Sequence, residues 1–313
     1  MTFVAVHPAV TRPIAITAML GSAACWGGAT VMTKGALEAF GPFTLLSIQL
    51  TASVTVLWLA ACVARVRLPP FGMAAHTGST GFLEPGLAYA VGVPGLAMTT
   101  ASNATVIASL EPVFILLLAW LLFRATMRGV SWLGILLSVV GVAVVSFAGP
   151  TDAANAATDG AGSILGDGLI LLGTLFAALY VIASSRLAQT MPALLLTALQ
   201  QTAGLCLVLL ILAVLIAVGW ERIPVDTSTP MLSLAIISGV VQYALAFWLY
   251  IVGLKGIPAG MAGLFLTTTP VFGVIGGFAF LDEQITLLQV SGIGCVMLGL
   301  CWVLWVEAGD RPA

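Results

Sequence analysis

The chain has 313 residues, of which 60% are hydrophobic and 7% are charged, and its formal net charge at pH 7 is −2. Soluble domains carry about 25% charged residues, whereas the mean hydropathy of this chain is +1.15. These values exclude a soluble globular enzyme, a disordered tail protein and a nucleic-acid-binding protein, which would need a basic face. Long continuous apolar runs exclude a β-barrel, whose segments are short and alternating. The sequence therefore predicts an all-α polytopic membrane protein.

Ten apolar segments are long enough to cross a bilayer, since a spanning helix needs about 20 residues. They lie at residues 13–34, 42–64, 74–96, 100–123, 130–149, 166–186, 192–218, 230–253, 258–280 and 285–306. The third segment contains Glu84 and Pro85, so we expect hydropathy alone to miss it. The first segment follows neither a basic n-region nor a small-residue cleavage site, which favours a retained signal-anchor.

The basic residues divide unequally between the two sides that ten spans define. One side, which also holds the N-terminus, carries Arg12, Arg65, Arg67, Arg124, Arg128, Arg186, Lys255 and Arg311. The other side carries Lys34 and Arg222. Because cytoplasmic loops are enriched in Lys and Arg, we expect both termini to be cytoplasmic and the protein to lie in a bacterial inner membrane.

The two halves of the chain resemble each other. A break at 150–165, rich in Ala, Gly and Asp, separates five spans from five, which predicts repeats at 1–150 and 160–313. A shift of 158 residues aligns Pro112 with Pro270, Gly134 with Gly292 and Gly141 with Gly299. Because five is odd, the second repeat must enter the membrane from the opposite side. The sequence therefore predicts ten transmembrane helices as two inverted five-helix repeats, which are typical of alternating-access transporters.

Three motifs occur in this duplicated order: ACWGGATVMTK at 24–34, ASLEPVFILLLAWLLF at 108–123, and TTTPVFGVIGGFAFLDEQITLLQVSGIGCVMLG at 267–299. With them, nearly the whole chain resembles the EamA-type ten-helix members of the drug/metabolite transporter superfamily. The resemblance implies secondary transport, mostly export, of small metabolites such as amino acids. It also implies a central cavity lined by the third, fourth, eighth and ninth helices. One departure is Gln49, where the family often has an Arg.

Two carboxyls, Glu84 and Glu111, lie within predicted spans, where inserting a charged side chain costs about 2.5–3.5 kcal/mol. This cost makes both residues candidates for binding a substrate or a proton, although each could instead be structural. Each precedes a proline, and a proline leaves the carbonyl four residues earlier without its helical donor. We therefore predict functional kinks at Pro85, Pro112 and Pro270, although prolines are also common in membrane helices.

Other polar and aromatic side chains at mid-span are further candidates for the wall of the cavity. Tyr243 and Phe247 are four residues apart and share a helix face, and Tyr89 is the repeat partner of Phe247. Mid-span aromatic rings can enclose an apolar group or stack on a ring. The predicted cavity residues, besides the two carboxyls, are Trp26, Tyr89, Asn103, Gln242, Tyr243, Phe247 and Thr268.

The sequence favours a secondary exporter of small metabolites, with neutral or aromatic amino acids as the favoured class. The alternative substrates are lipophilic cations or drugs. A sugar-phosphate or nucleotide-sugar carrier is disfavoured, because phosphate recognition would want Arg or Lys. A channel remains an alternative function. A membrane enzyme is disfavoured, because HExxH, GxSxG and phosphate-loop motifs are missing from the sequence. We expect no enzymatic activity, cofactor or metal, since the cysteines and histidines form no ligand pattern. The expected partners are a small molecule, the bilayer and, as a further candidate, protons; we expect a monomer that binds no nucleic acid.

Overall fold

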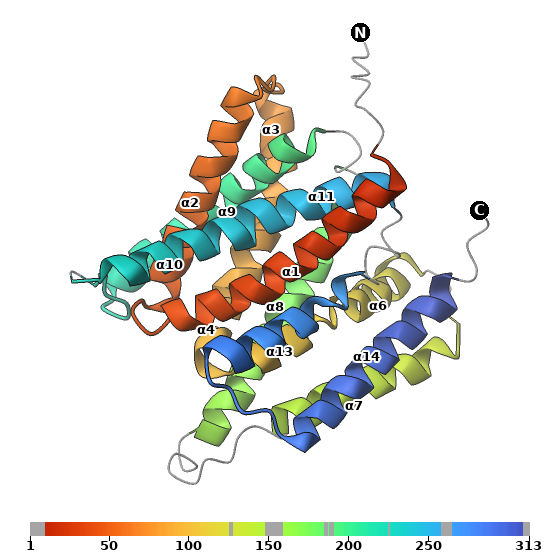
Figure 1. The fold of residues 1–313 in the computed structure, drawn as a ribbon. Coiled ribbons are helices and arrows are strands. Elements are labelled where there is room, and N and C mark those ends of the chain that lie inside the picture. The colour runs from red at the N-terminus through yellow and green to blue at the C-terminus, as the bar shows by residue number, and fades with distance from the viewer. Residues whose placement is uncertain are drawn as a thin grey trace.

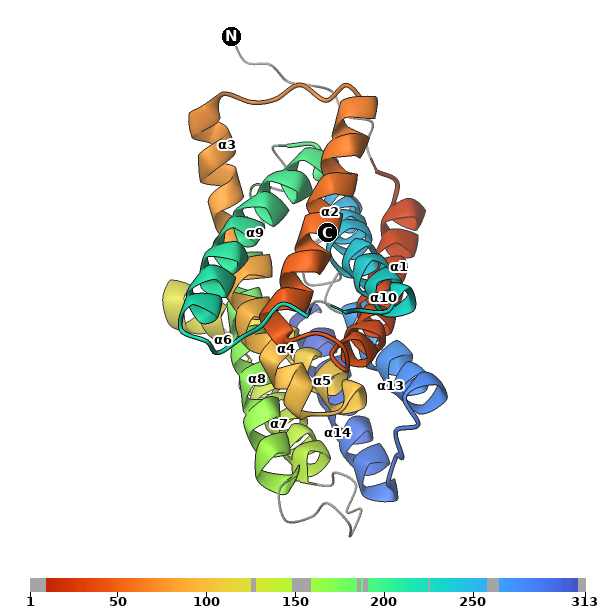
Figure 2. The same cartoon turned by 90° about the vertical axis from the view of Figure 1, so that its left-hand side faces the viewer.

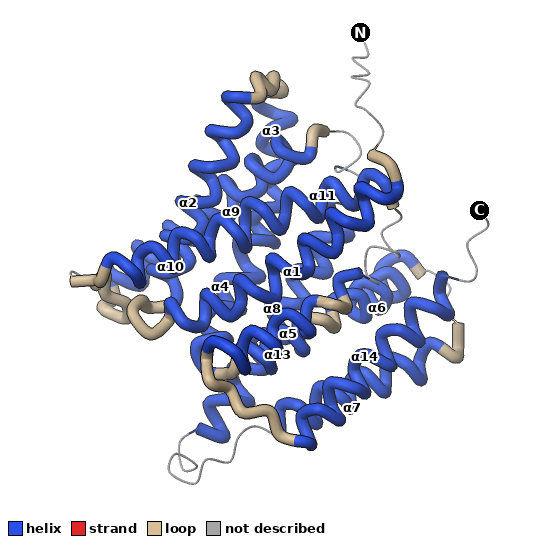
Figure 3. The backbone as a smooth tube through the Cα atoms, in the orientation of Figure 1, coloured by secondary structure: helices blue, strands red, loops and turns tan. Residues whose placement is uncertain are grey.

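A computed structural model describes residues 10–124, 128–147, 159–184, 187, 191–224, 226–257 and 265–308. Every regular element within these ranges is helical (Figures 1 and 3). The helices form ten spans, several of them interrupted, and this confirms the predicted all-α ten-helix fold. Arg186, Arg311 and most of the predicted break at 150–165 lie outside the described residues.

The first repeat consists of α1 (Arg12–Ala36), α2 (Pro42–Val63), a third span made of α3 (Phe71–Gly78), η1 (Ser79–Phe82), η2 (Leu83–Leu87) and α4 (Ala88–Met98), a fourth made of α5 (Ala101–Ala108) and α6 (Glu111–Phe123), and α7 (Ser131–Phe147). The second repeat consists of α8 (Asp159–Ser184), α9 (Ala193–Ala217), an eighth span made of α10 (Thr229–Gly239), η4 (Val240–Leu245) and α11 (Ala246–Gly256), then α13 (Thr269–Phe280) and α14 (Leu287–Ala308).

Six helices in the described ranges are long and apolar enough to cross a membrane, and three shorter apolar helices accompany them. The third span, which runs from α3 to α4, is not among the six. The boundary predicted for the sixth span needs a correction, since α8 begins at Asp159 rather than at 166. Hydropathy does not predict such an extension, because an acidic residue favours the first turn of a helix but does not lengthen its run of apolar residues.

The irregular turns of the backbone are repeated at equivalent positions in the two halves. The third and eighth spans each widen into a π-helical turn, at 83–87 and 240–245. The fourth span breaks into a turn at 109–110, and the same two-residue turn occurs at 267–268. The second turn lies at the shift of 158 residues found in the sequence. The duplication therefore includes the places where the helices are interrupted, and it supports the inverted-repeat fold.

The fifth helix of each repeat packs against its own copy. The helices α7 and α14 lie side by side in Figures 1 and 2. A Cβ added to Gly141 would lie 2.7 Å from the carbonyl oxygen of Gly292, and one added to Gly299 would lie 2.5 Å from that of Gly134. The glycine pairs that aligned in the sequence therefore let the two helix backbones touch, which is how small residues join membrane helices.

Candidate functional site

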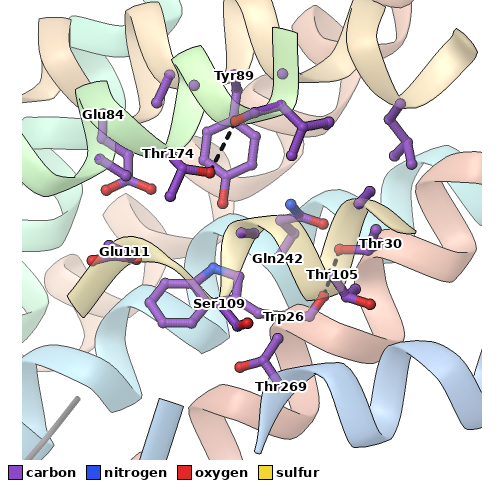
Figure 4. A pocket seen from close by; sticks show the side chains of 18 of the residues that line it. Trp26, Thr30, Glu84, Tyr89, Thr105, Ser109, Glu111, Thr174, Gln242 and Thr269 are labelled. Atoms are coloured by element: carbon purple, nitrogen blue, oxygen red, sulfur yellow. Dashed lines mark hydrogen bonds between the residues drawn. The ribbon is translucent and has the colours of Figure 1, made fainter. Parts of the chain in front are cut away.

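A cavity of about 140 Å³ lies in the interior of the helix bundle (Figure 4). Elements of both repeats form its wall, and they include the irregular turns of the third, fourth and eighth spans. Its polar and aromatic lining residues are Trp26, Thr30, Thr33, Glu84, Tyr89, Thr105, Ser109, Glu111, Thr174, Gln242 and Thr269. Irregular backbone at membrane depth is tolerated where it lines a cavity or is buried in protein. The breaks in the helices therefore coincide with the polar space that they create.

Both predicted carboxyls face this cavity. Glu84 is 7% exposed and has non-helical backbone angles of φ −147° and ψ 124°, which turn its side chain away from the path of the helix. Glu111 is the first residue of α6, directly after the turn at 109–110. Within the described part of the chain, neither carboxyl has a hydrogen bond or an ion pair. Among the described residues that line the cavity there is no Lys, Arg or His, so this part of the wall carries acidic groups without a fixed counter-charge.

The aromatic residues form two layers, one that lines the cavity and one that packs behind it. The side chains of Trp26 and Tyr89 line the cavity. Tyr243 lies edge-on behind Tyr89 with ring centroids 4.8 Å apart, and Phe247 lies edge-on against Trp26 at 5.2 Å. Tyr243 and Phe247 are 0% and 1% exposed and are not among the described residues that line the cavity. They support the two rings that do face the cavity.

Two other predicted residues lie outside the cavity. The carbonyl oxygen of the Asn103 side chain accepts a hydrogen bond of 3.3 Å from Gln289, and Asn103 borders a separate pocket where α5 begins. The hydroxyl of Thr268 donates to the carbonyl of Phe265 at 2.7 Å, whereas its neighbour Thr269 lines the cavity. One residue rotates a helical side chain by about 100°. The sequence identified these segments correctly but not the rotation of each helix.

The three predicted prolines lie at or beside the helix interruptions. Pro112 follows the turn at 109–110 and lines the cavity. Pro270 occupies the equivalent position at the start of α13. Pro85 lies in the widened turn of the third span, where a Cβ on Gly204 would come within 2.6 Å of its ring. Their role as moving hinges stays a prediction.

Several hydroxyl-bearing residues in the wall were missed from the sequence. Four of them donate to carbonyls of their own helices: Thr30 to Trp26, Thr105 to Ala101 and Ser102, Ser109 to Val106, and Thr174 to Ile170. Such internal bonds are common in helices, so nothing in the sequence favours these hydroxyls over others. Each of these hydroxyl protons is therefore engaged in a hydrogen bond within its own helix, and each hydroxyl oxygen remains available as an acceptor beside the cavity.

A chain of hydrogen bonds connects the cavity to α2 and α10. The amide of Gln49 donates to the hydroxyls of Thr33 at 2.9 Å and of Ser238 at 2.8 Å. Thr33 in turn donates to the side-chain oxygen of Gln242 at 3.5 Å. Gln49, which stands where the family often has an Arg, therefore fixes the neighbours of the cavity residue Gln242.

The chain was compared with protein-family models and with known proteins. The model of the EamA-like transporter family matches residues 13–147 and 164–305. An uncharacterized transporter of Methanothermobacter thermautotrophicus is 29% identical over 229 residues, which cover 72% of this chain and 63% of that protein. The uncharacterized transporter YetK of Bacillus subtilis is 26% identical over 209 residues, covering 66% of this chain and 60% of YetK. The matched part of the chain thus spans about three fifths of the length of these two relatives.

Other matches extend over more of the chain. The uncharacterized transporter sll0355 of Synechocystis is 23% identical over 296 residues, which cover 88% of this chain and 85% of that protein. One protein crystal structure superimposes with a TM-score of 0.63 and 17% identity, covering 96% of this chain and 98% of the other. At that identity the superposition shows a shared fold.

Proposed function

Since this chain belongs to the EamA-like transporter family and is a membrane transporter, we propose that it exports small metabolites by alternating access. The observation that carries the proposal is the interior cavity with two unpaired carboxyls, lined by elements of both inverted repeats. Binding sites between inverted repeats, formed by broken helices, are typical of secondary transporters. The symmetric interruptions of the fourth and ninth spans are consistent with such a site.

The proposed substrates are neutral or aromatic amino acids. A carboxyl at Glu84 or Glu111 can pair with the ammonium group of an amino acid, and the rings of Trp26 and Tyr89 can cover its apolar side chain. A proton is a second proposed partner, because a carboxyl that releases an ammonium group inside a membrane protein can take up a proton in its place.

Lipophilic cations are the second candidate class. They are favoured by the same two carboxyls and by the aromatic rings, since a cation is attracted to the face of an aromatic ring. Phosphorylated substrates are disfavoured, because the lining residues that the structure describes include no Lys or Arg to hold a phosphate.

The orientation in the membrane is also a proposal. The excess of Lys and Arg on one side supports cytoplasmic placement of both termini in a bacterial inner membrane. Reporter fusions after Arg12 and after Ala308 test it: both should report the cytoplasm. Opposite locations for the two fusions would contradict an even number of spans.

Uptake into proteoliposomes tests the transport activity. The purified chain would be reconstituted and offered a pool of labelled amino acids, with and without a pH gradient, beside liposomes that lack protein. We expect saturable uptake that changes with the gradient. Uptake no greater than that of empty liposomes, from protein shown to be folded, would contradict the assignment of amino acids. A rate that rises linearly with concentration without saturating would indicate a channel instead.

A further inference from the structure

The two repeats contribute different chemistry to the cavity at equivalent positions. The shift of 158 residues pairs Glu84 with Gln242 and Glu111 with Thr269, and all four residues line the cavity. Both carboxyls therefore come from the first repeat, whereas the second repeat places an amide and a hydroxyl at the same positions. In the view of Figure 4 the two carboxyls lie on one side of the cavity and Gln242 lies on the other.

Glu84 and Glu111 line the same cavity, and Figure 4 shows their side chains on the same side of it. The nearest basic residue along α1, Lys34, uses its ammonium group elsewhere, donating to the carbonyls of Leu96 at 2.9 Å and Ala97 at 3.2 Å. A buried carboxylate without a partner costs several kcal/mol. The neutralising charge must therefore come from protons or from a bound cation.

The uncharged part of the wall offers one unpartnered donor, the buried indole N–H of Trp26, and a larger number of acceptors. Four hydroxyls donate hydrogen bonds to carbonyls of their own helices, namely those of Thr30, Thr105, Ser109 and Thr174. Their oxygens can only accept from a ligand in the cavity. An ammonium group has three donors and no acceptor, so it fits this wall. A carboxylate, which only accepts, finds no charged donor among the residues that line the cavity.

We propose that the cavity recognises its substrate through an ammonium group bound at the wall of the first repeat, by Glu84 and Glu111, and not through a carboxylate. The substrate class is then primary amines with an apolar or aromatic body, in which free amino acids are included only because they carry such an amine. The proposal rests on the proposed transport function and deepens it. It also places the substrate against the first repeat: Glu84 and Glu111 hold its charged end, and Trp26 and Tyr89, which belong to the same repeat, lie along its apolar body.

A competition assay on the full chain tests the recognition of the amine. Labelled phenethylamine would be bound to the purified protein, and unlabelled phenylalaninamide, phenylalanine and 3-phenylpropionate would compete for it. We expect phenylalaninamide to compete at least as well as phenylalanine, and 3-phenylpropionate at least about tenfold more weakly, the ratio expected for one lost hydrogen bond to a charged group. Equal competition by 3-phenylpropionate would overturn the proposal, as would failure of folded protein to bind any amine.

Three variants test whether the charge must lie on the wall of the first repeat. Glu84→Gln should weaken phenethylamine binding about tenfold or more. Adding Gln242→Glu to that variant returns a carboxyl to the cavity on the opposite wall, and we expect binding to stay weak. Recovery of binding would overturn the orientation, because any carboxyl in the cavity would then suffice. Glu38→Gln, which changes an exposed carboxyl outside the cavity, should bind like the unaltered chain.

The measured pattern separates this proposal from the proposed function. Thermal unfolding in detergent identifies any variant that fails to fold, and Glu111→Gln then replaces Glu84→Gln. Uptake of phenethylamine without uptake of amino acids would support amine recognition while contradicting amino-acid export. Uptake of amino acids that 3-phenylpropionate blocks as well as phenylalaninamide does would support export while overturning amine recognition.

Discussion

Two adjacent glycines of α1 offer a test of how the helices around the cavity are packed. A Cβ added to Gly27 would lie 2.6 Å from the carbonyl oxygen of Thr269 and 2.9 Å from the backbone nitrogen of Gly273. A Cβ added to Gly28 would meet nothing within 4 Å. Gly27→Ala should therefore disturb the junction between α1 and the start of α13, and Gly28→Ala should not.

The expected size of the effect follows from these distances. Ordinary van der Waals contact of a Cβ begins at 3.4 Å, so the alanine at position 27 must push α13 away from α1. Overpacking of this kind costs about 1–3 kcal/mol. An alanine also gains up to about 1 kcal/mol over glycine in a helix, but both variants share that gain. The difference between Gly27→Ala and Gly28→Ala thus isolates the steric cost.

Thermal unfolding of the purified variants in detergent measures this difference. A loss of 1 kcal/mol lowers the midpoint by about 2–4 °C in domains of 150–250 residues, so Gly27→Ala should unfold several degrees below Gly28→Ala. It should also transport more slowly, because Thr269 lines the cavity. Equal midpoints and equal rates for the two variants would refute the packing of α1 against α13.

Three further changes test separate parts of the site. Glu111→Gln should abolish transport or remove its dependence on a pH gradient while expression is unchanged, and unaltered transport at every pH would remove this residue from the site. Pro112→Ala should slow turnover more than it weakens binding, because it straightens the interruption; a normal rate would show that the bend is incidental. Glu283 accepts the backbone amide of Ala101 at 2.6 Å, so Glu283→Ala should destabilise the fold by about 0.5–2 kcal/mol as a lost helix cap. In the same thermal assay, Glu38→Ala, another carboxyl change, should have little effect, and equal losses would contradict the cap.

The sequence was sufficient for the number of spans and for the duplication, because both depend on patterns that do not require knowing the rotation of a helix. Apolar length identifies a span, and a constant shift identifies the repeat. The position of Glu84 followed in the same way, since its repeat partner Gln242 lies at mid-span. Both of these residues line the cavity.

The rotation of each helix could not be predicted, because these helices are apolar on every side. In a soluble protein the polar face of a helix marks the solvent side, whereas a membrane helix carries apolar residues toward lipid and toward protein alike. For this reason the sequence does not separate Thr268, which lies outside the cavity, from Thr269, which lines it, and Asn103 also lies outside the cavity. Tyr243 and Phe247 were placed on the correct face of the eighth span, but sequence cannot show that Tyr89 and Trp26 stand in front of them.

The symmetry of the backbone and the asymmetry of the charges have different consequences for the proposed transport cycle. Alternating access exchanges the conformations of two inverted repeats, and the equivalent turns at 109–110 and 267–268 give each repeat the same place to bend. The carboxyls of Glu84 and Glu111 have no counterpart in the second repeat, so this exchange cannot move the negative charge to the other wall. A substrate held by its ammonium group must then stay attached to the first repeat while the second repeat moves relative to it. The states that open to the two sides of the membrane are therefore not equivalent for the substrate, even though equivalent helices of the two repeats form them.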